Sequence, residues 1–168
     1  MVSTTVADAR AIAQTVTDPE LPMLTLHDLG VLRGVRLDGE RVIVEITPTY
    51  SGCPAMAEMR SDLAARLHNA GYRDVTVRTV LSPPWTTDDI TERGRQVLAE
   101  HGIAPPGPAP RRGPGPVPLA LGVRPPAVDC PLCGSADTEL VSQFGATSCK
   151  SLHRCVACRE PFEHVKAH

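Results

Sequence analysis

Aromatic side chains are scarce in this chain and make up 3% of its 168 residues. Single-stranded nucleic acids are usually held by bases that stack on such rings. The formal net charge at pH 7 is −2, so the chain also lacks the basic excess that attracts a phosphate backbone. Arg154, Arg159 and Lys166 near the C-terminus do not alter that balance. We therefore expect no nucleic-acid partner.

Long apolar runs are missing as well. No stretch approaches the roughly 20 apolar residues that a membrane-spanning helix needs. Residues 1–14 contain no basic segment followed by an apolar core, as a signal peptide would. We therefore expect a soluble, cytoplasmic protein with no membrane partner. Thiols stay reduced in that compartment, where clustered cysteines usually bind metal.

Proline is distributed unevenly, because nine of the 17 prolines fall between Pro105 and Pro126. Such a stretch does not form a helix or a sheet and is typical of an extended, semi-rigid spacer. It divides the chain into three predicted parts. These are an α/β domain over residues 1–103, a Pro/Gly-rich linker over 104–128 and a cysteine-rich module over 129–168.

The first part has the pattern of a small α/β domain. We expect a first helix that ends before Pro19, followed by a hairpin of strands 29–37 and 42–47 that turns at Asp38-Gly39. A second helix then ends at Gly71 and is followed by a strand over 74–80. A last helix is capped by Thr86 or Thr87. The order helix, hairpin, helix, strand, helix predicts a two-layer α/β sandwich. A helical crossover joins the second and third strands, so we expect them to be parallel.

Cys53 stands where a predicted strand gives way to a predicted helix. Gly52 permits a tight turn, and Pro54 suits the first position of a helix. A thiol at a helix N-terminus faces unpaired N–H groups and the positive end of the helix dipole, which favours its thiolate. Cys53 is therefore a candidate metal ligand or nucleophile, and the alternative is a small cysteine that only packs. No histidine lies near it in sequence to act as a base, which leaves only the distant His27 and His68 as candidates, so we expect no enzymatic activity.

Two other features of this domain have competing interpretations. Asp18 and Glu20 flank Pro19 in a rigid acidic turn, which either faces a cation or is a solvated helix cap. Trp85 is the single tryptophan, and we expect it to anchor its loop over the core.

The module at the C-terminus contains two CxxC pairs, Cys130 with Cys133 and Cys155 with Cys158, separated by 21 residues. This spacing is typical of a four-thiolate zinc site, in which each pair forms a tight turn that directs two sulfurs at one ion. Iron is the alternative metal, and two separate dithiol redox pairs are a third interpretation. The module has about 40 residues, so we expect its fold to depend on the metal.

The remaining thiol and histidines of the module have weaker signals. Cys149 is an extra thiol, and the charge of Lys150 beside it would favour the thiolate. His153 lies near Cys155 and could replace a ligand, although four cysteines suffice. His164 and His168 are expected to be solvated.

Short motifs in both modules resemble known families. In the first part these are Asp18-Pro19-Glu20-Leu21-Pro22, Asp28-Leu29-Gly30-Val31, Thr47-Pro48-Thr49-Tyr50-Ser51-Gly52-Cys53-Pro54 and Pro83-Pro84-Trp85-Thr86. Together they resemble the small domain shared by iron–sulfur assembly factors. In the tail they are Phe144-Gly145, Cys149-Lys150, Arg154-Cys155 and Glu160-Pro161-Phe162. The tail is similar to that of the D subunits of ring 1,2-phenylacetyl-CoA epoxidases, the PaaD type.

The resemblance implies an accessory protein of phenylacetate catabolism. It would help to assemble a metal centre of the multicomponent oxygenase, and its partners would be the di-iron oxygenase and the iron–sulfur reductase. The alternative within that system is a zinc-ribbon subunit that scaffolds or regulates the oxygenase.

Specific residues receive roles from the same resemblance. Cys53 would handle iron or an iron–sulfur cluster, with Asp18 and Glu20 near it. The structural zinc would be held by Cys130, Cys133, Cys155 and Cys158. One thiolate cannot hold a cluster that takes about four ligands. Cluster binding would therefore be transient, and a second copy of the chain, Cys149 or the client protein would complete it.

Overall fold

The computed structural model describes residues 5–50, 52–109 and 127–167. The chain divides into two compact units, Met1–Val97 and Leu98–His168. Most of the predicted linker, residues 110–126, lies outside the described residues, and so does His168. The predicted ranges of the three parts therefore stay a prediction, and each unit is described by itself.

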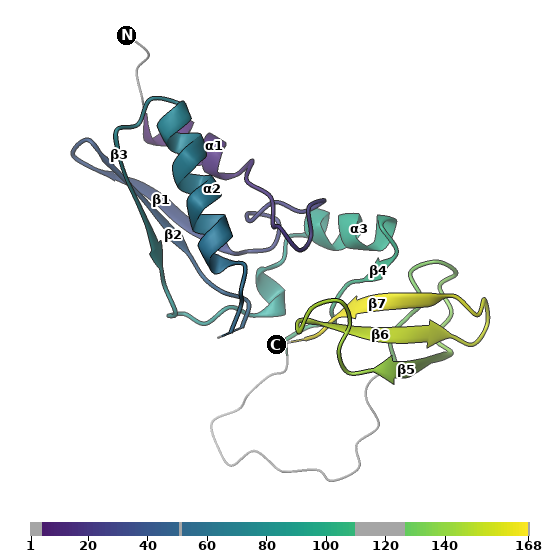
Figure 1. Cartoon of the computed structure of the whole chain (residues 1–168). Coiled ribbons are helices and arrows are strands. Elements are labelled where there is room, and N and C mark those ends of the chain that lie inside the picture. The colour runs from purple at the N-terminus through teal and green to yellow at the C-terminus, as the bar shows by residue number, and fades with distance from the viewer. Residues whose placement is uncertain (1–4, 51, 110–126, 168) are drawn as a thin grey trace. The chain divides into compact units, whose positions relative to one another are not determined.

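The first unit is built on a three-stranded sheet in the order β1-β2-β3. Strand β1 (Leu32–Asp38) pairs antiparallel with β2 (Arg41–Ile46), and β2 pairs parallel with β3 (Asp74–Thr79). Helices α1 (Val6–Ala13) and α2 (Met56–Asn69) cover one face of this sheet, as Figure 1 shows. The predicted two-layer sandwich and the parallel pairing of the second and third strands are confirmed.

The core of the first unit lies between the helices and the sheet. Ala9 and Ala13 of α1 and three residues of α2 are buried at helical spacing, and four of the six residues of β2 are buried as well. The buried residues of α2 and β2 are Met59, Leu63 and Leu67, and Val42, Ile43, Val44 and Ile46.

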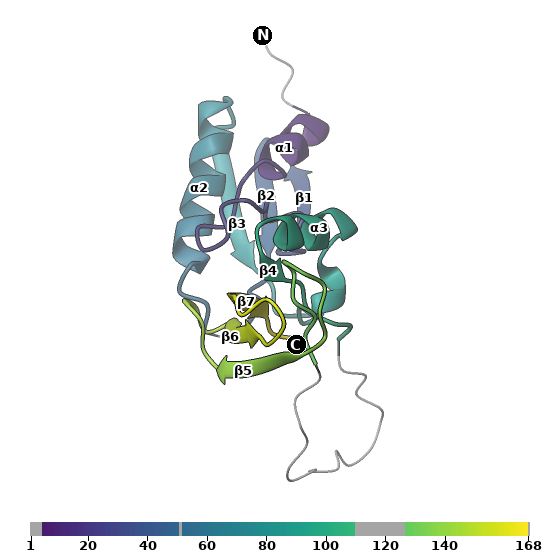
Figure 2. The same cartoon turned by 90° about the vertical axis from the view of Figure 1, so that its right-hand side faces the viewer.

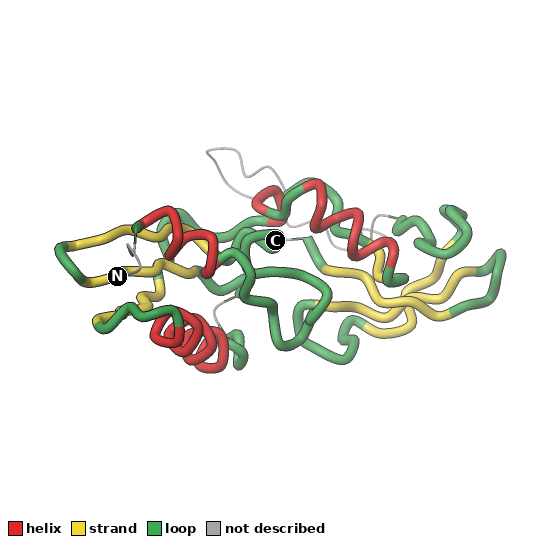
Figure 3. The backbone as a smooth tube through the Cα atoms, turned by 90° about the horizontal axis from the view of Figure 1, so that it is seen from above, coloured by secondary structure: helices red, strands yellow, loops and turns green. Residues whose placement is uncertain are grey.

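The hairpin turns one residue later than the sequence indicated. Asp38 pairs with Arg41, so the two-residue loop is Gly39-Glu40. Gly39 has a φ of 62°, which glycine adopts at no steric cost, and this position lets the ladder extend to Asp38. The loop is the tight turn at the left end of the tube in Figure 3.

Helix α1 ends at Ala13 and is shorter than predicted. Val16 is fully buried, but it lies in the turn that follows the helix. Its carbonyl accepts a hydrogen bond from the N–H of Leu26 (2.8 Å). Pairing of residues 16–18 with residues 24–26 therefore replaces the last helical turn. At the other end, the Thr5 hydroxyl accepts from the N–H of Asp8 and caps the helix.

Strand β1 begins at Leu32 rather than at residue 29. Gly30 has a φ of 69°, and a Cβ atom there would come within 2.6 Å of the Asp89 Cβ. Only glycine fits this position, and the chain turns through it before the strand starts. Trp85 lies nearby: it is 7% exposed and its Nε1 donates to the carbonyl of Leu29 (2.8 Å). The predicted role of Trp85 as a loop anchor is confirmed.

The last helix begins later than the sequence indicated. Thr86 caps a short 3₁₀ turn, η1 (Thr87–Asp89), whereas α3 spans Glu92–Glu100. The hydroxyl of Thr91 accepts from the N–H of Gly94 (3.0 Å) and caps α3. The predicted capping of this helix by Thr86 or Thr87 is therefore wrong. Ile90 has an extended backbone and separates the two helical segments.

The second unit has a four-stranded sheet in the order β4-β7-β6-β5. Strands β5 (Thr138–Ser142), β6 (Lys150–Cys155) and β7 (Pro161–Val165) are antiparallel neighbours (Figure 2). Strand β4 (Ile103–Ala104) pairs parallel with β7. Residues that precede the proline-rich stretch thus supply an edge strand of this sheet.

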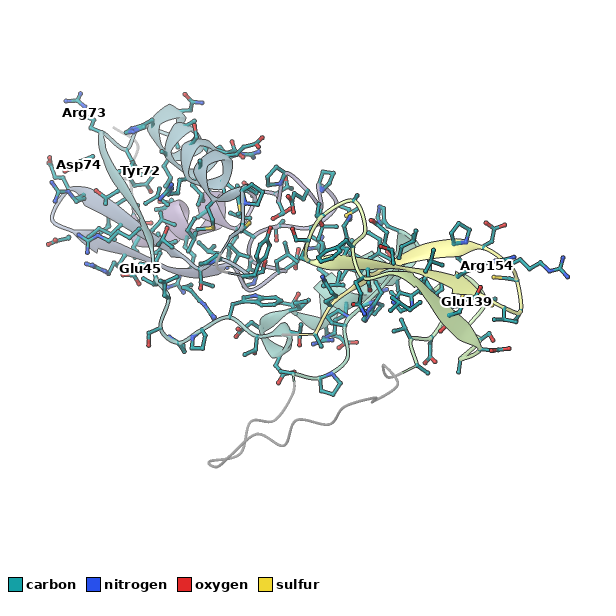
Figure 4. All side chains as sticks on the ribbon, turned by 60° about the horizontal axis from the view of Figure 1, so that its bottom comes forward. Glu45, Tyr72, Arg73, Asp74, Glu139 and Arg154 are labelled. Carbon is teal, nitrogen blue, oxygen red and sulfur yellow. The ribbon has the colours of Figure 1, made fainter. Side chains whose placement is uncertain are left out.

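A buried ion pair crosses two strands of the second unit. Lys150 Nζ lies 2.6 Å from Glu163 Oε2, and the lysine side chain is 6% exposed. Burial raises the pKa of Glu163, but hydrogen bonds from Lys150 and the Ala146 N–H outweigh it and hold that pKa below its ordinary value. The Glu139–Arg154 pair on β5 and β6 is exposed and 3.7 Å long, so it contributes little. Figure 4 labels both of its residues.

Candidate metal centre

Four cysteine sulfurs gather at one end of the second unit. The Sγ atoms of Cys130, Cys133, Cys155 and Cys158 all lie within 4.8 Å of one another. Cys130 Sγ is 3.8 Å from Cys158 Sγ, and Cys133 Sγ is 3.5 Å from Cys155 Sγ. These are the four cysteines of the two CxxC pairs, so the structure brings together the ligand set that spacing predicted.

The two CxxC pairs are held by equivalent backbone hydrogen bonds. The N–H of Cys130 donates to the carbonyl of Ser135 (2.9 Å), and the N–H of Cys155 donates to the carbonyl of Glu160 (3.0 Å). In each pair the first cysteine therefore bonds to the residue five positions later. The same turn is used twice, and each copy presents two sulfurs to a shared centre.

The residue after each second cysteine has the same unusual backbone conformation. Gly134 has a φ of 74° and Arg159 a φ of 67°, and Arg159 is the one non-glycine residue with positive φ in the described part of the chain. A non-glycine residue in this region costs about 1–2 kcal/mol. That the second turn keeps this conformation without a glycine indicates that the surrounding structure imposes it.

The arrangement of the sulfurs fits a tetrahedral ion. Sulfurs about 2.3 Å from a central zinc would lie about 3.8 Å apart at the corners of a regular tetrahedron. The separations of the Cys133–Cys155 and Cys130–Cys158 sulfurs, 3.5 and 3.8 Å, are close to that value. Cys130 and Cys155 are buried in a small apolar core with Ala104 and Phe162, and Cys133 is exposed. The four cysteines are thus placed to hold one metal ion.

The pKa values of the cysteine thiols indicate that the site requires a cation. The N–H of Cys158 donates to the sulfur of Cys155 (3.5 Å), and chiefly for that reason the pKa of Cys155 falls to about 7. A backbone hydrogen bond at Glu160 lowers the pKa of Cys158, but burial and the neighbouring sulfurs raise it to about 12. Four thiolates cannot coexist in this space without a cation, and a bound divalent ion would deprotonate all of them.

Cys149 does not belong to this cluster. Its Sγ lies 3.0 Å from the hydroxyl of Thr147, and its carbonyl accepts from the N–H of Lys166. The ammonium of Lys150 donates to Glu163 Oε2 (2.6 Å). Cys149 as a second functional thiol stays a prediction.

The histidines of the module form a separate cluster that the sequence did not indicate. His153 is buried and stacks on Phe162, and the hydroxyl of Ser151 lies 3.0 Å from His153 Nε2 and 3.3 Å from His164 Nδ1. Burial, together with the nearby His153, lowers the pKa of His164 to about 4. The expectation of a solvated His164 is therefore wrong. Cross-strand pairing of Ser151 with His164 explains the cluster, and sequence spacing does not reveal that register.

Cys53 is half-buried in the turn between β2 and α2, and its N–H donates to the carbonyl of Tyr50 (3.2 Å). Helix α2 begins at Met56 with Ala55 as its N-cap, so Pro54 is not its first helical residue. The predicted position of Cys53 directly at the helix N-terminus is wrong, because residues 54 and 55 form a further turn. The helix dipole acts mainly within the first turn, so its effect on this thiol is smaller than the spacing indicated.

Asp18 lies in the acidic turn that the sequence singled out. It is 8% exposed, and its Oδ1 accepts from the N–H groups of Glu20 (2.8 Å) and Leu21 (2.9 Å). Asp18 therefore caps this turn, and it does so from a buried position. The roles of Asp18 and Glu20 toward iron stay a prediction.

Asp28 is a residue whose structural importance the sequence reasoning missed. It is 3% exposed, and its carboxylate accepts from the hydroxyls of Thr25 (2.7 Å) and Thr91 (3.2 Å) and from the guanidinium of Arg93. Burial raises the pKa of Asp28, but the hydrogen bonds from Thr25 and Arg93 outweigh it and keep that pKa below its ordinary value. The signal was present as an acid in an apolar stretch, Leu26 to Val31.

Two family models match the chain in agreement with this geometry. One, described as "Iron-sulfur cluster assembly protein", matches residues 7–79, and the other, described as "PaaD zinc beta ribbon domain", matches residues 115–166. A protein of Escherichia coli (strain K12), described as a candidate D subunit of 1,2-phenylacetyl-CoA epoxidase, is 41% identical over 156 residues. The match covers 93% of this chain and 89% of that protein. The chain belongs to the PaaD family.

A solved structure supports the fold of this PaaD-family chain. The crystal structure of DUF59, a domain of unknown function, from Bacillus anthracis is 26% identical with a TM-score of 0.51. The match covers 55% of this chain and 90% of that one.

Within the described residues, no helix has the length and apolar character of a membrane span.

Proposed function

We propose that this protein is an accessory factor that helps to assemble or load a metal centre of a phenylacetyl-CoA epoxidase, and that it is not itself an enzyme. The observation that carries the proposal is the pairing of two parts in one chain. An iron–sulfur assembly domain is joined to a cysteine metal site, in a chain 41% identical to a candidate D subunit of that epoxidase.

The two metal-handling parts have different roles in this proposal. The four-cysteine site holds zinc for structure, because a closed set of four thiolates leaves no open position for chemistry. Cys53 is the working thiol. It lies in a turn at the end of β2 and receives iron or an iron–sulfur cluster as cargo. The acidic turn of Asp18 and Glu20 belongs to the same unit.

Cargo on Cys53 needs further ligands, because a cluster takes about four and Cys53 supplies one. A second copy of this chain or the client protein supplies them in the proposal, so binding is transient. The clients are the oxygenase and reductase subunits of the epoxidase system. Transient binding suits delivery, since a carrier with a complete ligand set would retain its cargo.

The experiment compares single-site variants in cells that lack the chromosomal copy of this gene. Cys53→Ser is tested against Ser61→Ala, which alters an exposed residue of α2. Reductase and oxygenase are then purified anaerobically, and their iron and acid-labile sulfide are measured. Cys53→Ser should lower the metal content of a client while Ser61→Ala leaves it at the wild-type level. Equal loading in both strains would overturn the role of Cys53.

A second candidate is a scaffold or regulatory subunit of the same oxygenase. It is favoured by apolar side chains that the second unit exposes. Leu132 and Val156, each inside a CxxC pair, are 55% and 49% exposed, and Phe144 is 66% exposed. Surface apolar groups of this kind often mark protein contacts. Co-purification with active oxygenase in stoichiometric amounts would support the scaffold role. Transient, sub-stoichiometric association would support the assembly role.

A further inference from the structure

A small cavity in the first unit has a one-sided charge. It lies between the end of α1 and the start of β1 and has a volume of about 150 Å³. Its polar lining consists of Arg10, Gln14, His27 and Arg33, and among the described residues no carboxylate lines it. The function proposed above uses none of these residues.

Arg33 is held at this cavity with donors to spare. Its Nη1 and Nη2 atoms donate to the two carboxylate oxygens of Asp89, at 3.1 and 3.0 Å. A guanidinium has five N–H donors, so the pair with Asp89 uses only part of the set. The Nε atom of Arg33 is buried and has no hydrogen-bond partner in the described part of the chain. A buried donor without a partner is costly, and an oxygen acceptor at this place would remove that cost.

Arg10 supplies a second guanidinium to the same cavity. It lies on α1 with an exposed side chain, and the described residues give it no ion-pair partner. His27 and the amide of Gln14 add two more groups that can donate hydrogen bonds. Planar guanidinium groups match the oxygens of phosphate and carboxylate in a forked geometry. The lining is therefore suited to an oxyanion.

The volume restricts the class of ligand. Pockets for drug-sized ligands and nucleotide cofactors are about 300–1,000 Å³, whereas a cavity of about 150 Å³ holds a molecule the size of benzene. Phosphate and acetate are smaller than benzene and fit. The second cavity near the β1–β2 turn provides a contrast, because Glu40 and Asp74 line it together with Tyr72 and Arg73. Figure 4 labels the last three of these residues.

We propose that the cavity bounded by Arg10, Gln14, His27 and Arg33 binds a small oxyanion, a phosphate or a carboxylate. Arg33, fixed by Asp89, supplies its remaining donors to the site, and Arg10 of α1 supplies a second guanidinium. The site is independent of Cys53 and of the four-cysteine cluster.

The test is a titration of the full-length, metal-loaded protein followed by ¹⁵N–¹H NMR. Sodium phosphate and sodium acetate are added separately at constant ionic strength, with sodium chloride as the reference. We expect saturable shifts of the backbone signals of Arg10, Gln14, His27 and Gly34. Saturation by phosphate alone, acetate alone or both supports the site and identifies which oxyanion it prefers.

Matched variants separate this site from general surface charge. Arg10→Ala removes one guanidinium of the cavity, and Arg60→Ala removes an exposed arginine from α2 outside it. Loss of charge-assisted hydrogen bonds should weaken oxyanion binding about tenfold in Arg10→Ala and leave it unchanged in Arg60→Ala. Arg33→Lys keeps the charge but loses the fork, and should weaken binding while the first unit stays folded. Absence of saturation with either anion, or equal weakening in Arg10→Ala and Arg60→Ala, would overturn the proposal.

Discussion

The carboxylate of Asp28 accepts a hydrogen bond from the hydroxyl of Thr91, a residue 63 positions later in the chain (3.2 Å). The backbone N–H of Thr91 also donates to the backbone carbonyl of Asp28 (2.9 Å). Thr91 also caps α3, so one buried acid holds the turn before β1 and the start of α3 in place. These hydrogen bonds hold together two turns that are far apart in the sequence and are not joined by strand pairing.

Replacing Asp28 by Asn should destabilise the first unit by about 2 kcal/mol, because a buried acceptor of charged and neutral donors loses its charge. Urea unfolding of the full-length protein, followed by NMR signals of residues 5–50, measures the effect. Asp62→Asn on the exposed face of α2 is the control, since it removes only an exposed pair with Arg66. Equal stability of the two variants would contradict the role of Asp28.

The same carboxylate makes the first unit sensitive to acid. The folded-state pKa of Asp28 lies below its ordinary value of 3.8, so the stability from the ionised form is fully present above that value. It is lost as the pH falls through the lowered pKa of the folded protein. Acid unfolding of wild type and Asp28→Asn should therefore converge below about pH 3.8. A stability difference that is independent of pH would contradict this assignment.

Removal of the metal should unfold the second unit. Structural zinc sites supply roughly 10–16 kcal/mol of apparent binding energy, and the apolar core around these cysteines contains few large side chains. Excess chelator should collapse the NMR signals of residues 127–167 into the range of unfolded chains. Cys155→Ser should do the same without chelator, and Cys149→Ser should not. A tail that keeps its dispersed signals after complete metal removal would show that the ion is not required.

The two CxxC turns should respond in opposite ways to substitution. Arg159→Gly relieves a non-glycine residue of positive φ and should leave the metal-loaded module as stable or up to about 1 kcal/mol more stable. Gly134→Ala creates the same strain in the first turn and should cost about 1–2 kcal/mol. Chelator competition followed by tail unfolding measures both. Destabilisation by Arg159→Gly would indicate that the arginine side chain has a role of its own.

Local sequence patterns were sufficient to predict the order of elements in the first unit. Helical spacing of Met59, Leu63 and Leu67 follows from burial of one face of α2, which the structure reproduces. In β2, Ile43 is as buried as Val42 and Val44, so both faces of that strand are covered. The four metal ligands were equally predictable, because a CxxC turn is a local structure. Neither inference required knowledge of which distant segments meet.

The features that sequence reasoning missed mostly depend on distant contacts. The partners of Asp28 include residues far away in the chain, and the half-buried His164 meets His153 through its register opposite Ser151. Strand β4 has two residues and gains its place from pairing with β7. The start of α2 was misplaced for a local reason, because Pro54 is acceptable both in a first helical turn and in the turn before it.

Metal loading of the epoxidase subunits in cells is the decisive test of a role for this protein in metal-centre assembly. Oxygenase and reductase are purified from cells with and without this protein, and their iron and acid-labile sulfide are measured per polypeptide. We expect that at least one of them is under-loaded and less active when the protein is absent, and that the wild-type gene restores it. Fully loaded, fully active oxygenase and reductase from cells without this protein would show that it has no such role.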